Sequence, residues 1–400
     1  MTDPDVSFTL AATMSTAAAP QGDTAERTTA LSHRIAREVA RLGPPGWVEV
    51  EASFAMTAAA EITLVVFGDG EDRIARVFPT DEILAMLREH RHLSASFGDG
   101  PWWRYLLSMT SEGRMDVDYD YGDEPFPDDQ LFPPTVYRTD IEIYPRERLP
   151  VWLAAYLNHG DRQVRTPRLA AEQARADAAA GTVATRSAPD VEFPALPEMT
   201  SRWALIAAAF VAVESDLGPR AAPAFLVFEG TSRGGATLCK LPGDRAVLSG
   251  GVWDAPELDA AYNGVGTFPQ LYRGAPSWVA DVVLNRRAAN GLLTFCYWWE
   301  GGHWHRGDSP RADDLAGAVP GVWSAQTVVD VIASRLGDAA SAAQLAAIPA
   351  LVRAAEQSSM THELLSAVFP GTGFDVDGAW FQLTVAGLTT ERRAEVAADA

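Results

Sequence analysis

The sequence predicts an α+β fold: an antiparallel sheet with flanking helices, followed by a mainly helical C-terminal segment. Two observations carry this prediction. Segments with apolar residues at every third or fourth position alternate with short strand-like runs, and turn residues separate neighbouring runs closely enough for hairpins. A comparable order of elements returns after residue 198, which suggests that the 400-residue chain holds two diverged copies of one fold.

The first expected element is an amphipathic helix over residues 29–42. Leu31, Ile35 and Val39 share one face of it, whereas charged residues point away. The Gly-Pro-Pro-Gly sequence at residues 43–46 ends this helix, because proline lacks the amide hydrogen that a further turn requires. Residues 1–28 have neither a basic start nor a continuous apolar run, so we expect a disordered leader and not a secretory signal.

Three strands are expected next, at residues 47–54, 61–67 and 72–77. Each is rich in β-branched or aromatic residues. The Gly-Asp-Gly sequence at residues 68–70 is typical of a turn and separates the second strand from the third. These three strands predict an antiparallel meander.

A second helix is expected from the capping residue Thr80 to about Arg91. Residues 102–110 and 114–121 then have the pattern of a hairpin. A third helix is expected over residues 145–157, because proline is tolerated at the first helical position. The order helix, three strands, helix, hairpin and helix completes a first domain of residues 29–157.

Residues 158–198 break this pattern and are the expected linker between domains. They contain an Ala-rich stretch at residues 168–180 that we expect to be helical, followed by small and polar residues. The second α+β domain is expected to occupy residues 199–400.

The second domain is expected to begin with an apolar helix at residues 203–213. Three strands follow, at residues 225–228, 237–241 and 246–249, and then a helix at residues 277–287.

A hairpin is expected at residues 292–299 and 303–306, in the place that the hairpin of the first half occupies. A helix at residues 324–336 and a mainly helical C-terminal segment follow. Residues 379–385 are the one strand that we expect in that segment.

The charge balance limits the class of partner. The chain has 53 acidic and 32 basic residues, a formal net charge of −21. A nucleic-acid or anionic-membrane partner is disfavoured because both require basic surface, whereas a basic protein partner is favoured by opposite potentials. No uninterrupted apolar stretch is long enough to span a bilayer, and the two cysteines provide no disulfide framework. These features predict a cytoplasmic protein.

Residues 29–157 resemble the YezG-like immunity (antitoxin) family. The similarity rests on features in a shared order: Ile35-Ala36 in the opening helix, Pro45-Gly46-Trp47, the strand at residues 49–54, Trp102-Trp103, and the run from Glu112 to Tyr121. The resemblance implies an α+β protein that binds a cognate toxin domain in the cytoplasm and blocks it by occlusion. It implies no catalytic residue and no cofactor. A looser similarity to immunity factors of NAD-glycohydrolase toxins leaves the toxin as a nuclease or an NAD glycohydrolase.

The candidate partner-binding site is an acidic and aromatic strand with the loop after it. Its residues are Asp116, Asp118, Tyr119, Asp120, Tyr121, Asp123, Glu124 and Phe126. Alternation along a strand places the three aspartates of residues 116–120 on one face, where a cationic partner would relieve their repulsion. The aromatic side chains would supply anchors for an interface. A solvated strand face and a calcium site are the alternatives, although the run lacks the glycine and glutamate of an EF-hand loop.

A metal-dependent enzyme is the least favoured alternative to an immunity protein, after a binding or scaffold protein unrelated to toxins. His303 and His305 share one face of a strand, as two metal ligands could, but the sequence indicates no third ligand. Cys239 and Cys296 lie in apolar strands and are expected to be inert core residues. No phosphate loop or hydrolase nucleophile motif is present, so we predict a protein without enzymatic activity, metal or cofactor.

Overall fold

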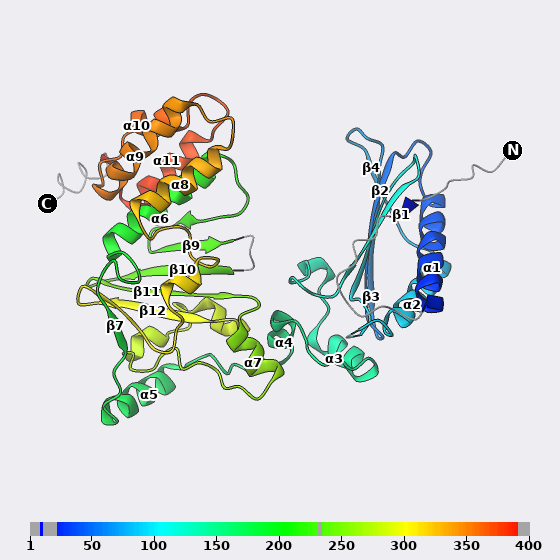
Figure 1. Ribbon diagram of the computed structural model, residues 1–400, viewed down its shortest axis with the longest axis horizontal. Helices are drawn as coiled ribbons and strands as arrows, with labels where there is room; N and C mark the ends of the chain where they lie inside the picture. Colours follow the sequence, from blue (N-terminus) through cyan, green and yellow to red (C-terminus); the bar gives the residue numbers. More distant parts are fainter. Residues whose placement is uncertain (1–8, 11–21, 99, 231–233, 391–400) are drawn as a thin grey trace. The chain divides into compact units, whose positions relative to one another are not determined.

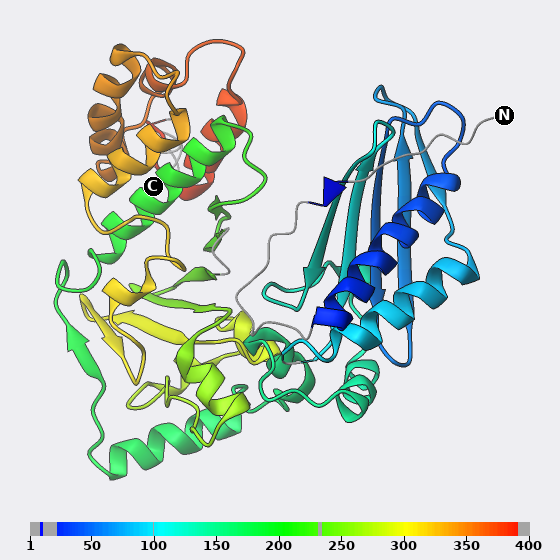
Figure 2. The same ribbon diagram turned by 45° about the vertical axis from the view of Figure 1, so that its right-hand side comes forward.

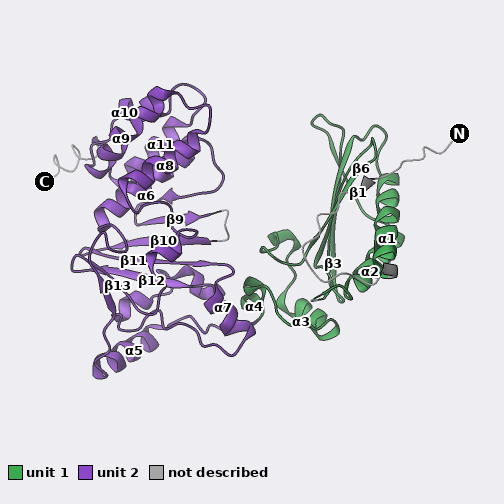
Figure 3. Cartoon of the chain, viewed as in Figure 1, with its two compact units in different colours: residues 1–157 green, residues 158–400 purple. Residues whose placement is uncertain are grey.

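The chain divides into two compact α+β units, residues 1–157 and 158–400 (Figure 3). The computed structural model describes residues 9–10, 22–98, 100–230 and 234–390. Most of the expected leader therefore lies outside the described residues. Within them, no helix is long and apolar enough to cross a membrane.

The first unit keeps the expected order of elements and adds two that were not expected. Its elements are β1 (Thr9–Leu10), α1 (Gly22–Arg41), β2 (Glu49–Met56), β3 (Glu61–Gly68), β4 (Ile74–Val77), α2 (Asp81–Ser94), β5 (Arg104–Thr110), β6 (Arg114–Asp120), α3 (Pro134–Ile143) and α4 (Val151–Asn158). The two additional elements are β1 and α3. Helix α1 begins at Gly22, so the last seven residues of the expected leader are helical. Thr80 caps α2 as expected, because its hydroxyl accepts a hydrogen bond from the amide of Ile83.

Five strands of the first unit form an antiparallel sheet in the order β6-β5-β2-β3-β4, and the short β1 pairs with β6 in parallel. Helices α1 and α2 lie side by side across one face of this sheet (Figures 1 and 2). Leu31, Ile35 and Val39 of α1 pack there against inward residues of the strands, such as Val50 and Phe54. The apolar residues that recur with the helical period and those that alternate along the strands therefore pack into one core.

The second unit contains more elements than expected. They are α5 (Pro167–Ala179), β7 (Thr185–Ser187), α6 (Leu196–Ala212), β8 (Arg220–Ala221), β9 (Phe225–Glu229), β10 (Gly234–Leu241), β11 (Arg245–Val252), α7 (Pro256–Asn263), β12 (Phe295–Glu300), β13 (His303–Arg306), α8 (Ala325–Leu336), α9 (Ala342–Glu356), α10 (His362–Val368) and α11 (Val376–Ala386). Its sheet has the order β7-β13-β12-β11-β10-β9-β8 and is antiparallel throughout. The C-terminal region is mainly helical, as predicted.

Both faces of the second sheet are covered. Figure 1 shows α6 and α8–α11 gathered on one side of the strands, with α5 and α7 on the other. Along β11, Leu248 belongs to the core on the side of α6, and its neighbour Val247 belongs to the opposite core. Tyr297 and Trp298 of β12 divide in the same way. A strand buried on both faces has a continuous apolar sequence, as these strands do.

Several expected elements are corrected. Residues 145–157 do not form one helix: α4 begins only after Pro150, since the residue before a proline avoids helical geometry. In place of the helix expected at residues 277–287 the structure has two short 3-10 helices, Ser277–Ala280 and Arg286–Asn290. Between them the side-chain amide of Asn285 donates to the carbonyls of Val279 and Asp281, which competes with a regular helix.

The expected strand at residues 379–385 is instead part of helix α11. A short apolar run fits a strand or a buried helix equally well. Here Asp375 caps the helix by accepting from the amide of Gly378, and Gly387 ends it in the left-handed conformation. Helix α11 packs against α6 and buries Ala379 and Leu383.

Residues 158–198 belong to the second unit and are not a linker. They contain α5 in the place of the expected Ala-rich helix, and β7 adds an edge strand to the sheet by pairing with β13. Gln163 is 6% exposed, and its side-chain amide exchanges two hydrogen bonds with the backbone of Leu293. Several residues of this segment are therefore packed into the second unit, although its small and polar composition is typical of a linker.

The two sheets differ in strand order, which argues against the suggested duplication. In the first unit the hairpin β5–β6 lies beside β2, the first strand of the meander. In the second unit the corresponding hairpin β12–β13 lies beside β11, the last strand of its meander. A shared order of elements along the chain thus leads to two topologies.

Candidate functional site

The candidate site lies on the face of the first sheet opposite α1 and α2. We call it the open face and define it by Glu49, Glu51, Leu64, Val66, Ile74, Arg76, Leu106, Asp116 and Asp118. The strand register sets Asp116 opposite Ser108, and Ser108 opposite Glu51. The next row sets Asp118 opposite Leu106. Residues from β6, β5, β2, β3 and β4 therefore form one continuous surface.

Carboxylates occupy much of this surface. Asp116 and Asp118 are exposed and share one face of β6, as the alternation of the sequence predicted. Glu49 and Glu51 are exposed on β2, and partial burial together with the charge of Glu49 raises the pKa of Glu51. Like charges on adjacent positions repel one another, so a cation brought to this face would be attracted.

Apolar side chains lie beside these carboxylates. Ile74 is 79% exposed on the edge strand β4, and Phe78, directly after that strand, is 81% exposed. Leu64, Val66 and Leu106 are partly exposed in the middle of the face. Exposed apolar residues that form a contiguous patch with a charged border are typical of a binding surface.

Asp120 does not belong to the free acidic row that the sequence predicted. Its carboxylate forms a 2.7 Å ion pair with Arg104 and accepts a hydrogen bond from the amide of Gly122. Arg104 also donates to the side chain of Gln130, which bonds Ser53 as well. Burial raises the pKa of Asp120, although the Gly122 amide and the Arg104 charge act in the opposite direction. The loop after β6 thus covers this end of the open face.

The predicted aromatic anchors are not on the open face either. Tyr119 points to the helix side of the sheet, where its ring stacks on that of the buried His90 at 5.3 Å. Tyr121 packs partly buried against the same core. Phe126 is 5% exposed and contacts Trp152 of α4 edge to face. The alternation that exposes Asp116 and Asp118 turns Tyr119 and Tyr121 inward, since successive side chains point to opposite faces.

The acidic loop residues Asp123 and Glu124 are exposed, as expected. The loop is tied to α4, because the indole of Trp152 donates to the carbonyl of Gly122. Of the eight predicted site residues, four are therefore exposed carboxylates, and the other four are partly or fully buried in the first unit.

Sequence reasoning missed the contribution of the other strands to this face. The alternation Glu49-Val50-Glu51-Ala52 was present in the expected first strand and indicated a face with exposed carboxylates. The position of that face beside Asp116 and Asp118 depends on β5 pairing with both β2 and β6, which no local pattern reveals.

His303 and His305, the two residues of the alternative metal site, contact different neighbours. The ring of His303 is 2.9 Å from the guanidinium of Arg186, a cationic neighbour that opposes a bound metal ion. His305 stacks on Trp298 at 5.7 Å, and burial lowers its pKa. Among the described residues, no group of three or more histidine, cysteine or acidic side chains could hold a metal ion.

Both cysteines are buried in the second sheet, at positions where burial raises the pKa of the thiol. A raised pKa keeps the thiol protonated and therefore weakly nucleophilic. The geometry agrees with the prediction that Cys239 and Cys296 are core residues.

Compared with models of known protein families and with curated proteins, the chain matches none. The resemblance of residues 29–157 to immunity proteins therefore stays a prediction that rests on the sequence features named above.

Proposed function

We propose that this chain is an immunity protein that binds a cognate toxin domain through the open face of its first unit and blocks the toxin by occlusion. The observation that carries the proposal is the combination, on the open face, of exposed carboxylates with exposed apolar side chains.

The charges of the open face suit a basic partner. Asp116, Asp118, Glu49 and Glu51 outnumber Arg76 and the neighbouring Arg114, and the whole chain has a net charge of −21. A negative surface on a negative protein accelerates encounter with a basic domain and fixes its orientation. A toxin domain that acts on nucleic acid, or on another polyanion, has the basic surface that such a face would complement.

The apolar residues of the open face would prolong the lifetime of the complex, which charge alone does not do. Long-range attraction raises the association rate, whereas the lifetime of a complex depends on well-packed apolar contacts at its centre. Ile74, Phe78 and Val66 are placed to make such contacts next to the acidic row. A scaffold protein could use the same face, and the nature of the captured partner separates that alternative from an immunity protein.

The test is capture of partners from the native cell lysate by the full chain, followed by an activity assay of each captured domain. The proposal requires a basic domain with toxic activity that is lost when this chain is added at equimolar ratio. Capture of partners without toxic activity supports a scaffold protein instead.

Two double variants locate the interface on the captured domain. Ile74→Ser with Phe78→Ser should weaken binding at least tenfold because they remove exposed apolar contacts. The matched control is Val265→Ser with Val283→Ser, which changes two similarly exposed residues of the second unit. Equal binding by both variants would place the interface away from the open face.

A further inference from the structure

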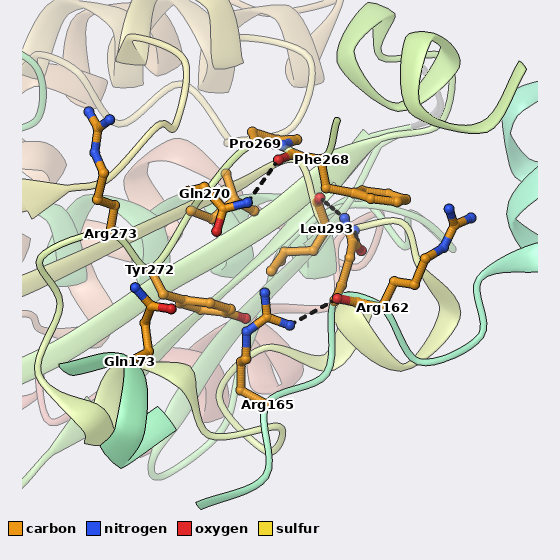
Figure 4. Close-up of a pocket in the computed structure, with 11 residues that line it drawn as sticks. Arg162, Arg165, Gln173, Phe268, Pro269, Gln270, Tyr272, Arg273 and Leu293 are labelled. Carbon is orange, nitrogen blue, oxygen red and sulfur yellow. Dashed lines mark hydrogen bonds between the residues drawn. The ribbon is translucent and has the colours of Figure 1, made fainter. Parts of the chain in front are cut away.

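A small depression in the second unit is not assigned a ligand. Figure 4 shows its lining residues, among which the guanidinium of Arg162 points away from Arg165 and from Tyr272. The polar groups therefore do not converge on one position, and the space between them holds little more than a water molecule. A small-molecule site combines a larger hollow with convergent polar groups.

The edge strand β4 of the first sheet is a binding feature of a different kind. It is the last strand of its sheet, and in the part of the chain that the structure describes no strand pairs with its outer side. The backbone N–H and C=O groups on the outer side of an edge strand can pair with a strand of another protein. The pairing of β4 with β3 decides which residues present these groups.

Ile74 and Arg76 turn their backbone groups toward the free edge. In an antiparallel pair, residues that exchange hydrogen bonds alternate with residues that do not. The amide of Asp69 donates to the carbonyl of Arg73, so the bonded pairs continue at every second position along β4, and Ile74 and Arg76 are the positions between. Gly68, opposite Ile74, agrees with this pattern because its carbonyl accepts from the amide that precedes β2.

The side chains at these positions suit pairing with an extended partner. Ile74 and Arg76 are exposed on the open face, and Phe78 follows two positions later with its side chain exposed as well. Neighbours on adjacent strands contact each other on one face of a sheet, so an added strand would place apolar side chains beside Ile74 and Phe78. Its side chain opposite Arg76 would be neutral or acidic, because like charges in that position are destabilising.

The opposite edge of the sheet is less suited to a partner strand. The outer side of β6 is partly occupied, because β1 pairs there with Arg114 and Met115. Further along β6, Asp116 and Asp118 are exposed, and charged side chains on an edge strand discourage pairing. The sequence of β4 has Arg76 as its one charged residue. Of the two edges, β4 is therefore the one that favours strand addition.

A second copy of this chain is a poor occupant of the edge. Two β4 strands paired antiparallel about Arg76 would bring each Ile74 opposite the Phe78 of the other copy. The same register would set the two Arg76 side chains directly opposite each other, which destabilises a strand pair. A strand of four residues also gives a contact far smaller than a stable dimer requires. The charges therefore favour a different protein.

On the basis of the proposed function, we propose that the toxin domain bound to the open face also adds one of its strands to the outer side of β4. The edge is continuous with the open face, since Ile74 and Arg76 belong to both. Main-chain hydrogen bonds at the edge would fix the register of the toxin along β4, whereas the side chains of the open face would select the partner.

The test uses Arg76→Pro, which removes an outward N–H of β4 and keeps the hydrogen bonds to β3, because proline is tolerated where the N–H faces away from the sheet. The matched control is Arg76→Ala, which removes the same side chain and keeps the N–H. The basic domain captured from lysate should bind Arg76→Pro about tenfold or more weakly than Arg76→Ala, because the added strand loses a main-chain hydrogen bond and meets the proline ring. Circular dichroism and thermal unfolding establish that both variants are folded.

Amide hydrogen exchange on the native chain is a second measurement that needs no variant. Binding of the toxin domain should slow exchange at the amides of Ile74 and Arg76 by about tenfold or more, because both gain a hydrogen bond. The amide of Ala75, which pairs with Phe67 of β3, should be protected with and without the toxin domain. Docking through side chains alone would leave exchange at Ile74 and Arg76 fast.

The outcomes distinguish failure of strand addition from failure of the proposed function. Equal binding by folded Arg76→Pro and Arg76→Ala, with fast exchange at Arg76 in the complex, overturns strand addition and leaves toxin binding intact. Capture of no toxin domain overturns both. A native chain that is a dimer by light scattering, and a monomer as Arg76→Pro, would place a second copy on the edge and also overturn strand addition. If Arg76→Pro does not fold, the exchange at Arg76 in the native complex decides.

Discussion

The two sheets of this chain use their faces differently. Strands β11 and β12 of the second sheet are buried on both sides, so that successive residues such as Val247 and Leu248 enter opposite cores. In the first sheet, β2 and β6 alternate between buried and exposed residues, with α1 and α2 on one face. A sheet that uses both faces for its own packing leaves neither face exposed, whereas the first sheet leaves Glu51, Asp116 and Asp118 exposed on one face.

The covered side of the first unit should be far more sensitive to substitution than its surface. The side chains of Arg91 of α2 and Asp140 of α3 are 4% and 0% exposed and form a 2.8 Å ion pair. Arg91→Ala leaves Asp140 buried without its cation, which should cost about 3–5 kcal/mol. Arg88 lies on the same helix as Arg91, and Arg88→Ala breaks its exposed pair with Glu61 of β3, which should cost less than about 1 kcal/mol. Urea unfolding of both variants measures the difference, and similar losses would contradict it.

One leucine in each sheet tests the comparison directly. Leu248→Ala in the second sheet removes a fully buried side chain and should lower the free energy of unfolding by about 2–5 kcal/mol. Leu64→Ala on the open face removes a partly exposed side chain, and its cost should be smaller because water already reaches the site. A loss for Leu64→Ala as large as that for Leu248→Ala would mean that the open face is covered in the folded protein.

The covered face of the first sheet should also make stability dependent on pH. The ring of His90 is buried, accepts a hydrogen bond from the indole of Trp102, and has its pKa lowered to about 4 by burial. An unfolded histidine has a pKa of about 6.5, so below that pH only the unfolded state binds the proton. This contribution is present above pH 6.5 and is lost as the pH falls toward 4, by about 2 kcal/mol between pH 7 and pH 5.

Unfolding at pH 7 and pH 5, for the native chain and for His90→Gln, isolates this effect. The variant is less stable at pH 7 because the ring and its hydrogen bonds are lost, but its stability should fall less steeply with acid. Equal slopes for the two proteins would exclude His90 as the source.

The smallest effect on stability is expected from the exposed acidic row. Asp116→Asn with Asp118→Asn should leave the unfolding curve unchanged, because both side chains are exposed. Association with the basic domain captured from lysate should slow about three- to tenfold at low salt, and the difference should shrink as salt screens the charges. Asp313→Asn with Asp314→Asn removes the same charge from exposed positions of the second unit and is the control. Equal association rates for the two variants would mean that the acidic row takes no part in binding.

The candidate site was predictable only in the part that local alternation controls. A strand exposes every second side chain, so the exposure of Asp116 and Asp118 could be predicted from their spacing. The same rule turns Tyr119 inward, but the sequence does not show which side of the strand is covered, so it does not separate the exposed aspartates from the buried aromatic side chains. The ion pair of Asp120 with Arg104 follows from the pairing of β5 with β6 and could not be predicted from charge alone.

By itself the sequence determined the α+β class, the acidic balance and the positions of most helices and strands, such as the cap at Thr80. Such features depend on interactions between residues a few positions apart, and periodicity records those interactions directly. Tertiary structure decided the strand orders, the helical state of residues 379–385, and the face that Glu51 shares with Asp116. These outcomes depend on contacts between residues far apart in the chain, which only the packing of the whole unit selects.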